Sequence, residues 1–109
     1  MEPTIRQLSA PELARALARP EPPLLLDVRE LWERAIASIE PAISVPLSQL
    51  PHGLAGLAQN AEIAVYCHHG VRSLHACNFL AAQGYTQLVN LEGGIDAWSR
   101  EVDATVPRY

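Results

Sequence analysis

The stretch Glu62-Ile63-Ala64-Val65-Tyr66-Cys67-His68-His69-Gly70-Val71-Arg72-Ser73 passes from an apolar run into a short polar loop. The run over 62–66 is typical of a strand that is buried on both faces of a parallel sheet. The residues from Ser73 to Gln83 predict a helix, with Gly84 as the residue that ends it. Cys67 is therefore expected at the carboxyl end of a central strand, where parallel α/β sheets bind their ligands.

Strand and helix patterns alternate along the rest of the chain. Strands are expected over 4–8, 24–28, 42–45 and 87–91, and helices over 9–19, 30–37 and 95–100, with a weak helix or turn over 48–58. This order predicts a single α/β domain over residues 1–109, with a central, mostly parallel five-stranded sheet and helices on both faces. The tail over 103–109 has no periodicity and is expected to lie on the surface.

The composition excludes several classes of protein. A chain of 109 residues, with 49% hydrophobic and 18% charged residues, can bury one core and does not resemble a disordered chain. Its formal charge of −4 argues against a basic nucleic-acid binder, and no apolar run approaches the roughly 20 residues of a membrane span. Two cysteines are too few for a disulfide scaffold, and the first residues do not form a secretory signal. We expect a soluble cytoplasmic domain, monomeric by default, that binds neither nucleic acid nor membranes.

The loop after the central strand has the features of a reactive cysteine site. A helix start offers unpaired backbone N–H groups and the positive end of the helix dipole, and both favour a thiolate at Cys67. No Asp or Glu occurs between Glu62 and Glu92, and Arg72 is the one Lys or Arg in that stretch. Gly70 suits a tight loop that needs a positive φ. These residues predict that Cys67 is a nucleophile that handles anionic substrates with the help of Arg72.

The segment from Cys67 to Ser73 resembles the active-site loop Cys-x-x-Gly-x-Arg-Ser of the rhodanese-like sulfurtransferases. Three other blocks resemble the family in the same order along the chain: Leu-Leu-Asp-Val-Arg-Glu at 25–30, Ala42 to Pro46, and Leu-Glu-Gly-Gly-Ile-Asp-Ala-Trp at 91–98. The family's Gly-His-Ile-x-Gly-Ala segment is replaced by Ala-Ser-Ile-Glu-Pro-Ala at 37–42, which predicts a different local turn. The resemblance implies the rhodanese-like fold.

The resemblance also implies a thiosulfate sulfurtransferase of the rhodanese type. Cys67 would accept a sulfane sulfur from thiosulfate or a persulfide donor and pass it to cyanide in vitro, or to a thiol or protein acceptor in vivo. Arg72 would attract the anionic donor and favour the thiolate. The substrate site would be lined by His68, His69, Gly70, Val71 and Ser73, although loop histidines are more often exposed without a role. Neither a metal nor an organic cofactor is implied.

Two other functions remain as alternatives. Cysteine-dependent phosphatases and arsenate reductases on the related fold use a Cys-x5-Arg loop, one residue longer than the loop from Cys67 to Arg72, so a terminal sulfur suits this ring better than phosphate. A sulfur-relay or regulatory docking module is the second alternative. Intact Cys67 and Arg72 argue against an inactive module, but they leave open a carrier that a desulfurase loads.

Residues outside the loop have plainer interpretations. Arg29 follows a buried strand and is either a structural ion-pair partner or a secondary electrostatic group near the site. Cys77 lies on an apolar helix stripe, which predicts a core position and no disulfide with Cys67. Trp32 and Trp98 are expected to pack, whereas an exposed Trp beside the loop would indicate a docking surface.

Overall fold

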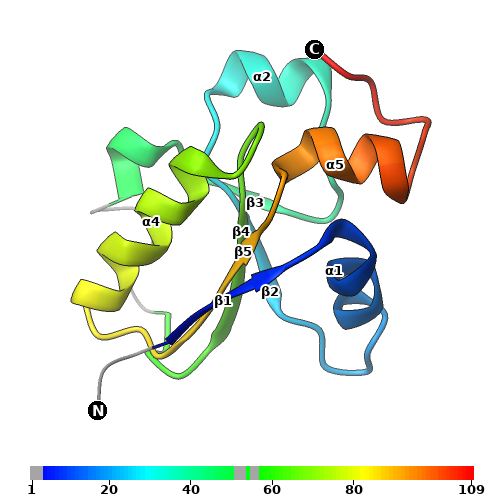
Figure 1. Ribbon diagram of the computed structural model, residues 1–109. Coiled ribbons are helices and arrows are strands. Elements are labelled where there is room, and N and C mark those ends of the chain that lie inside the picture. Colours follow the sequence, from blue (N-terminus) through cyan, green and yellow to red (C-terminus); the bar gives the residue numbers. More distant parts are fainter. Residues whose placement is uncertain (1–3, 51–53, 55–56) are drawn as a thin grey trace.

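Five strands, all paired in parallel, form a sheet at the centre of the molecule (Figure 1). The computed structural model describes residues 4–50, 54 and 57–109. The strands are β1 (Thr4–Leu8), β2 (Leu24–Asp27), β3 (Ile43–Ser44), β4 (Glu62–Tyr66) and β5 (Gln87–Leu91), in the spatial order β1-β5-β4-β2-β3. The predicted parallel α/β sheet is confirmed, and β1, β4 and β5 have the predicted bounds.

Helices cover both faces of the sheet. They are α1 (Ala10–Leu17), α2 (Leu31–Ile36), the 3-10 helix η1 (Leu47–Gln49), α4 (Val71–Ala82) and α5 (Gly94–Glu101). α1 and α5 lie on one face, α4 lies on the other, and α2 lies beyond the carboxyl ends of the strands (Figure 1). The expected helix or turn over 48–58 falls partly outside the described residues, and η1 occupies its beginning.

α4 begins two residues earlier than the sequence pattern predicts. Gly70 is its N-cap, with a φ of 104°, a left-handed conformation that glycine adopts without the cost of a Cβ clash. Arg72 and Ser73 therefore belong to the first turn of the helix, where backbone N–H groups lack partners within the helix. This early start brings the helix N-terminus directly to Cys67.

The core is divided by the sheet into two apolar layers. Along β4, Ile63 and Val65 face the layer of α4, whereas Ala64 and Tyr66 face the layer of α1 and α5. Cys77 is fully buried in the α4 layer, as its helix stripe predicts, and burial raises the pKa of its thiol to about 12. A thiol with this pKa stays protonated at neutral pH and is a poor nucleophile.

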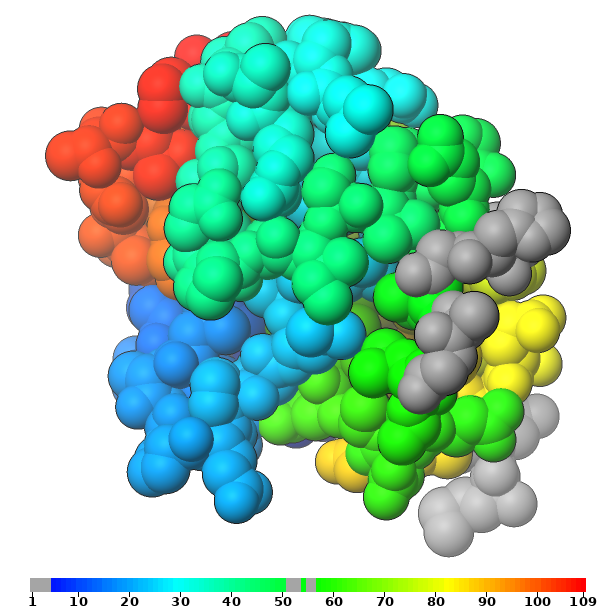
Figure 2. All heavy atoms as spheres, turned by 180° about the vertical axis from the view of Figure 1, so that it is seen from behind, coloured from blue at the N-terminus to red at the C-terminus, as the bar shows by residue number. Residues whose placement is uncertain are grey.

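The tail folds back toward the α2 end of the molecule. One hollow is lined by the tail, through residues 103 and 105–107, by Trp98 of α5, and by residues 34–40. Figure 2 shows the tail and the segment 34–40 side by side. Tyr109 is not among the residues that line this hollow, and it is partly buried. In the part of the chain that the structure describes, no helix has the length and apolar character needed to cross a membrane.

Candidate active site

Backbone N–H groups converge on the sulfur of Cys67. Its Sγ accepts hydrogen bonds from the N–H of Gly70 at 3.1 Å and from the N–H of Ser73 at 3.3 Å. The residue is 1% exposed, so these donors act where water competes little. Together with the start of α4, this arrangement places hydrogen-bond donors where a sulfur nucleophile would carry its negative charge.

The start of α5 orients the same loop from its other side. The N–H of Ile95 donates to the carbonyl of Cys67 at 2.9 Å, and the N–H of Asp96 donates to the carbonyl of His68 at 3.1 Å. The loop carbonyls therefore point toward α5, which leaves the N–H groups of Gly70 and Ser73 free for the sulfur. The contact is close because the α5 start carries a glycine: a Cβ on Gly94 would lie 2.3 Å from the His68 carbonyl oxygen.

Gly94→Ala is expected to destabilise the domain by at least about 2 kcal/mol and to slow alkylation of Cys67. Gly94 has a φ of 63°, and its new Cβ would clash with backbone atoms of Cys67 and His68, which cannot move without displacing the sulfur's donors. Urea unfolding and iodoacetamide kinetics would measure both effects.

Gly84→Ala is the matched control for that substitution. Gly84 also has a positive φ, of 100°, but its Cβ would meet the amide end of the Gln59 side chain, which can move aside. It is expected to cost less stability and to leave alkylation of Cys67 unchanged. Equal effects of the two variants on alkylation would contradict the role given to Gly94.

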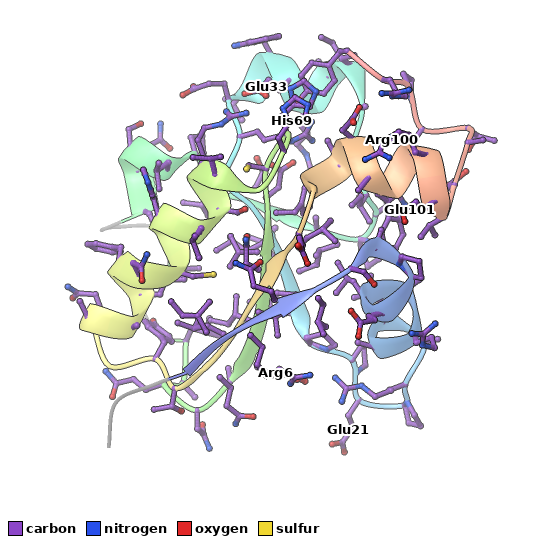
Figure 3. All side chains as sticks on the ribbon, viewed as in Figure 1. Arg6, Glu21, Glu33, His69, Arg100 and Glu101 are labelled. Atoms are coloured by element: carbon purple, nitrogen blue, oxygen red, sulfur yellow. The ribbon has the colours of Figure 1, made fainter. Side chains whose placement is uncertain are left out.

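Arg72 is held by a carboxylate from another element. Its Nη1 and Nη2 donate to the two carboxylate oxygens of Glu33 on α2, at 2.6 and 2.8 Å. This bidentate pair lowers the pKa of Glu33 to about 2 and raises the pKa of Arg72. Figure 3 shows Glu33 and His69 at one end of the molecule, opposite Arg6 and Glu21.

The ion pair changes what is expected of Arg72. The acid-free stretch in the sequence is not acid-free in space, because α2 brings the buried carboxylate of Glu33 to the start of α4. Much of the charge of Arg72 is therefore compensated before any donor arrives. Its attraction of an anionic donor stays a prediction, while its contact with Glu33 joins α2 to the start of α4.

The Glu33 carboxylate should make stability depend on pH in acid. Because its folded pKa is about 2, below the ordinary 4.5, its contribution is present above pH 4.5 and is lost as the pH falls through 2. We expect Glu33→Gln to lower the free energy of unfolding by about 2 kcal/mol at neutral pH, and the difference from wild type to shrink toward pH 2. Urea titrations across this range test it, and a difference that does not vary with pH would contradict it.

Arg29 belongs to the interior rather than to the mouth of the site. Its side chain is fully buried. All its N–H groups have acceptors, which are the two carboxylate oxygens of Asp27, the carbonyls of Ala37 and Glu33, and the hydroxyl of Tyr109. A sulfur donor cannot contact a side chain without exposed surface, so Arg29 is a structural ion-pair partner of Asp27. An electrostatic effect of its charge on the site from a distance stays a prediction.

Tyr109 is a residue of the site region that sequence reasoning missed. Its hydroxyl donates to Glu33 at 2.6 Å and accepts from Arg29, and burial raises its pKa to about 12. Its ring stacks on His68, with centroids 3.9 Å apart, and His68 in turn stacks on His69 at 4.0 Å. Burial lowers the pKa of His68, which keeps its ring neutral at neutral pH. No periodicity or motif in the tail signalled these contacts.

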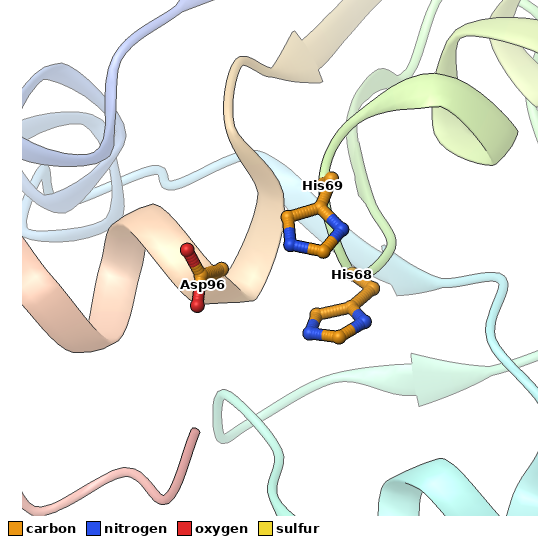
Figure 4. A group of neighbouring side chains, drawn as sticks. All are labelled: His68, His69 and Asp96. Carbon is orange, nitrogen blue, oxygen red and sulfur yellow. The ribbon is translucent and has the colours of Figure 1, made fainter. Parts of the chain in front are cut away.

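His68, His69 and Asp96 form a group with the spacing of possible metal ligands (Figure 4). Their orientation argues against a shared ion. An imidazole binds a metal along the lone pair in its ring plane, and the two rings are nearly parallel, at 24°, and stacked. Both carboxylate oxygens of Asp96 are already paired with Arg100 and Arg108. We therefore assign this group no metal.

The prediction that Trp32 packs is wrong, whereas Trp98 packs as predicted. Trp32 is 62% exposed, and Leu31 beside it is 63% exposed. The short helix α2 lies beyond the sheet, so the side chain that it buries is Glu33, and the apolar side chains at its start face solvent. Val71, the loop residue at the start of α4, is also exposed.

Asn90 is a second residue that sequence reasoning missed. It lies on β5, is 2% exposed, and forms hydrogen bonds with the side chain of Ser73 and the carbonyl of Gly70. A signal for it was present, since one polar residue interrupts the otherwise apolar run from Leu88 to Leu91. A polar residue at a buried strand position usually has a specific partner.

Comparison with known proteins gives a consistent result. A profile of the rhodanese-like domain family matches residues 9–101. A sulfurtransferase of Allochromatium vinosum is 34% identical over 96 residues, covering 88% of this chain and 90% of that protein. A putative sulfurtransferase of Bacillus subtilis, YtwF, is 33% identical, covering 89% and 93%. The adenylyltransferase and sulfurtransferase MOCS3-1 of Zea mays is 38% identical over 82% of this chain, but the match covers 20% of that larger protein.

Solved structures agree with the sequence relatives. The crystal structure of a rhodanese-like domain protein from Staphylococcus aureus superposes with a TM-score of 0.81 at 30% identity, covering 95% of this chain and 98% of that one. A rhodanese-related protein from Thermoplasma volcanium gives a TM-score of 0.77 at 34% identity, covering 89% and 93%. With the cysteine loop, the sheet order and these matches together, the chain belongs to the rhodanese-like domain family of sulfurtransferases.

Proposed function

We propose that the chain transfers a sulfane sulfur from thiosulfate, or from a persulfide donor, to a thiophilic acceptor through a persulfide on Cys67. The observation that carries this proposal is the pair of N–H groups, from Gly70 and Ser73, that point at the Cys67 sulfur. Such donors stabilise negative charge on the Cys67 sulfur, which carries that charge when it attacks a sulfur donor and again when it leaves the transferred sulfur. The relatives named as sulfurtransferases support the same chemistry.

Two displacement steps make up the reaction. In the first, the Cys67 thiolate attacks the outer sulfur of thiosulfate, a new S–S bond forms, and sulfite leaves with the electron pair of the old bond. In the second, cyanide or an acceptor thiolate attacks the outer sulfur of the persulfide, and the Cys67 sulfur leaves as a thiolate. The two steps balance without an external oxidant or reductant.

The site supports sulfur better than phosphate. The six-residue ring from Cys67 to Arg72 is small for a tetrahedral oxyanion. The guanidinium of Arg72, which a phosphatase needs for its substrate, is bound bidentately by Glu33. Hydrolysis of an aryl phosphate that depends on Cys67 would reverse this preference.

The test is intact mass spectrometry of the reduced protein before and after incubation with thiosulfate, and again after addition of cyanide. We expect the mass to rise by one sulfur atom on Cys67 and to return to its starting value with release of thiocyanate. No gain in mass with thiosulfate or with a small-molecule persulfide would overturn the proposal.

A relay role, in which proteins supply or accept the sulfur, is favoured by the surface around the loop. Leu31, Trp32 and Val71 are each more than 60% exposed, and the Glu33–Arg72 ion pair holds their two helix starts together. Exposed large apolar side chains beside a reactive group are typical of a protein docking surface. In this role thiosulfate would load Cys67 slowly, whereas a cysteine desulfurase with cysteine would load it within minutes.

Trp32→Ala separates the two roles. A docking contact predicts slower loading from the desulfurase and unchanged loading from thiosulfate, because the small anion does not touch Trp32. Equal rates for the variant and the wild type with the desulfurase would remove Trp32 from the docking surface.

A further inference from the structure

The side-chain amide of Asn90 has a single possible orientation. Its Nδ2 lies 3.2 Å from the carbonyl oxygen of Gly70 and 2.9 Å from Oε1 of Gln7 on β1. A backbone carbonyl oxygen only accepts hydrogen bonds, so the end of the amide that faces it has to be the NH₂ group. The oxygen of Asn90 therefore faces Ser73 and acts as an acceptor.

The hydroxyl of Ser73 lies between this acceptor and the reactive sulfur. Its one proton is donated to Oδ1 of Asn90, while its Oγ lies 3.3 Å from the Sγ of Cys67. Both Ser73 and Asn90 are buried, so no water competes for that proton. With its proton engaged, Ser73 presents a lone pair to the sulfur. A Cys67 thiol can donate to that lone pair, but a thiolate gains nothing from it.

Because the Ser73 hydroxyl donates to Asn90 and not to Cys67, this hydrogen-bond chain affects how well the sulfur carries negative charge. The sulfur of Cys67 is an anion when it attacks a donor, and it leaves as an anion when an acceptor takes the outer sulfur. Two backbone N–H groups stabilise that anion, from Gly70 and Ser73, and the Ser73 hydroxyl would be a third donor if its proton were free. A less basic sulfur is a better leaving group but a weaker nucleophile.

We infer that Asn90 is a positioning residue that holds the hydroxyl proton of Ser73 away from Cys67 and thereby limits the thiolate fraction of Cys67 and its ability to leave. The effect of Asn90 on sulfur delivery rests on the proposed function, whereas its effect on the thiolate fraction of Cys67 does not. Asn90 touches neither donor nor acceptor and acts through Ser73. The hydrogen bond from the Asn90 NH₂ group to the Gly70 carbonyl also connects this side chain to the loop after Cys67.

The test measures the rate of iodoacetamide alkylation of Cys67 as a function of pH, in a Cys77→Ala background with no sulfur donor present. Asn90→Leu removes the acceptor with little change in volume and frees the Ser73 proton for the thiolate. We expect the midpoint of the alkylation profile to move to lower pH by about one unit. A purely structural role predicts the opposite sign, because a loosened loop would weaken the backbone donors.

Ser73→Ala keeps the inference testable if Asn90→Leu does not fold. In the wild type the Ser73 hydroxyl does not donate to the sulfur, so its removal is expected to leave the midpoint unchanged or slightly lower. The double variant Asn90→Leu/Ser73→Ala should lose the shift that Asn90→Leu produces. A midpoint that rises by half a unit or more in Ser73→Ala would overturn the inference, as would an Asn90→Leu shift that persists in the double variant.

Sulfur delivery gives an independent measurement. In single-turnover release of sulfur to cyanide, Asn90→Leu loaded with thiosulfate is expected to react about three- to tenfold faster than wild type, because Cys67 leaves more readily. Failure of both proteins to load would contradict the proposed function and leave the alkylation result standing. A slower release from Asn90→Leu would contradict the inference itself.

Discussion

Cys67→Ser is expected to abolish loading by thiosulfate and to reduce thiocyanate formation by at least about 10³-fold. The serine hydroxyl would occupy the same cradle, beside the N–H groups of Gly70 and Ser73, but it is not ionised at neutral pH and cannot form a persulfide. Intact mass and a thiocyanate assay measure the two effects.

Cys77→Ala is the matched control, since it removes the other cysteine of the chain. Cys77 is buried in the α4 layer, and its raised pKa keeps it a thiol, so this variant should load and turn over like wild type. Thermal melting should show that Cys67→Ser stays folded. Turnover retained by Cys67→Ser, or a sulfur atom found on Cys77, would contradict the assignment of the nucleophile.

Asp27→Asn is expected to lower the free energy of unfolding by about 3–5 kcal/mol, a large share of the 5–15 kcal/mol typical of such a domain. Asp27 and Arg29 are both fully buried, and two N–H···O contacts of 3.0 and 2.8 Å join their side chains. Removing the negative charge leaves the guanidinium of Arg29 uncompensated in the interior, where no water can replace the lost partner. Urea unfolding at neutral pH measures the loss.

Arg19→Gln is the control for a salt bridge that is exposed. Arg19 donates to Glu62 at 2.7 Å, but its side chain is 48% exposed, so the substitution should cost less than about 1 kcal/mol. If Asp27→Asn cost no more than Arg19→Gln, the buried pair would not be the anchor that its geometry indicates. The effect should extend to the site, because Arg29 also binds Tyr109, which binds Glu33.

Local hydrophobic patterns in the sequence predicted where the strands of the sheet lie. The apolar run over 62–66 and the alternation over 4–8 and 87–91 predicted three strands with their observed bounds, since a strand's burial is recorded in consecutive residues. The short strand β3 was predicted one residue too long at each end, because its pairing to β2 covers Ile43 and Ser44 alone. The place of Cys67 between a strand and a helix start followed from the same local signals.

Helix faces were predicted less well where a helix does not pack on the sheet. Trp32 was expected to pack, but α2 lies beyond the strand ends and buries Glu33 instead. Glu33 can be buried because Arg72 and Tyr109, from two other elements, satisfy its carboxylate. Periodicity records which residues share a face of the helix, and it contains no information on what that face meets.

The sequence by itself determined that Cys67 is a nucleophile candidate at the start of a helix, because the strand, the glycine and the helix that build this junction are contiguous. Only the tertiary structure decided which side chains pair with the residues around that sulfur. The pairing of Arg72 with Glu33 joins residues 39 positions apart, and the bond from Ser73 to Asn90 joins residues 17 positions apart. Such partners are brought together by the packing of separate elements, and the free energy of each contact depends on a burial that no local pattern contains.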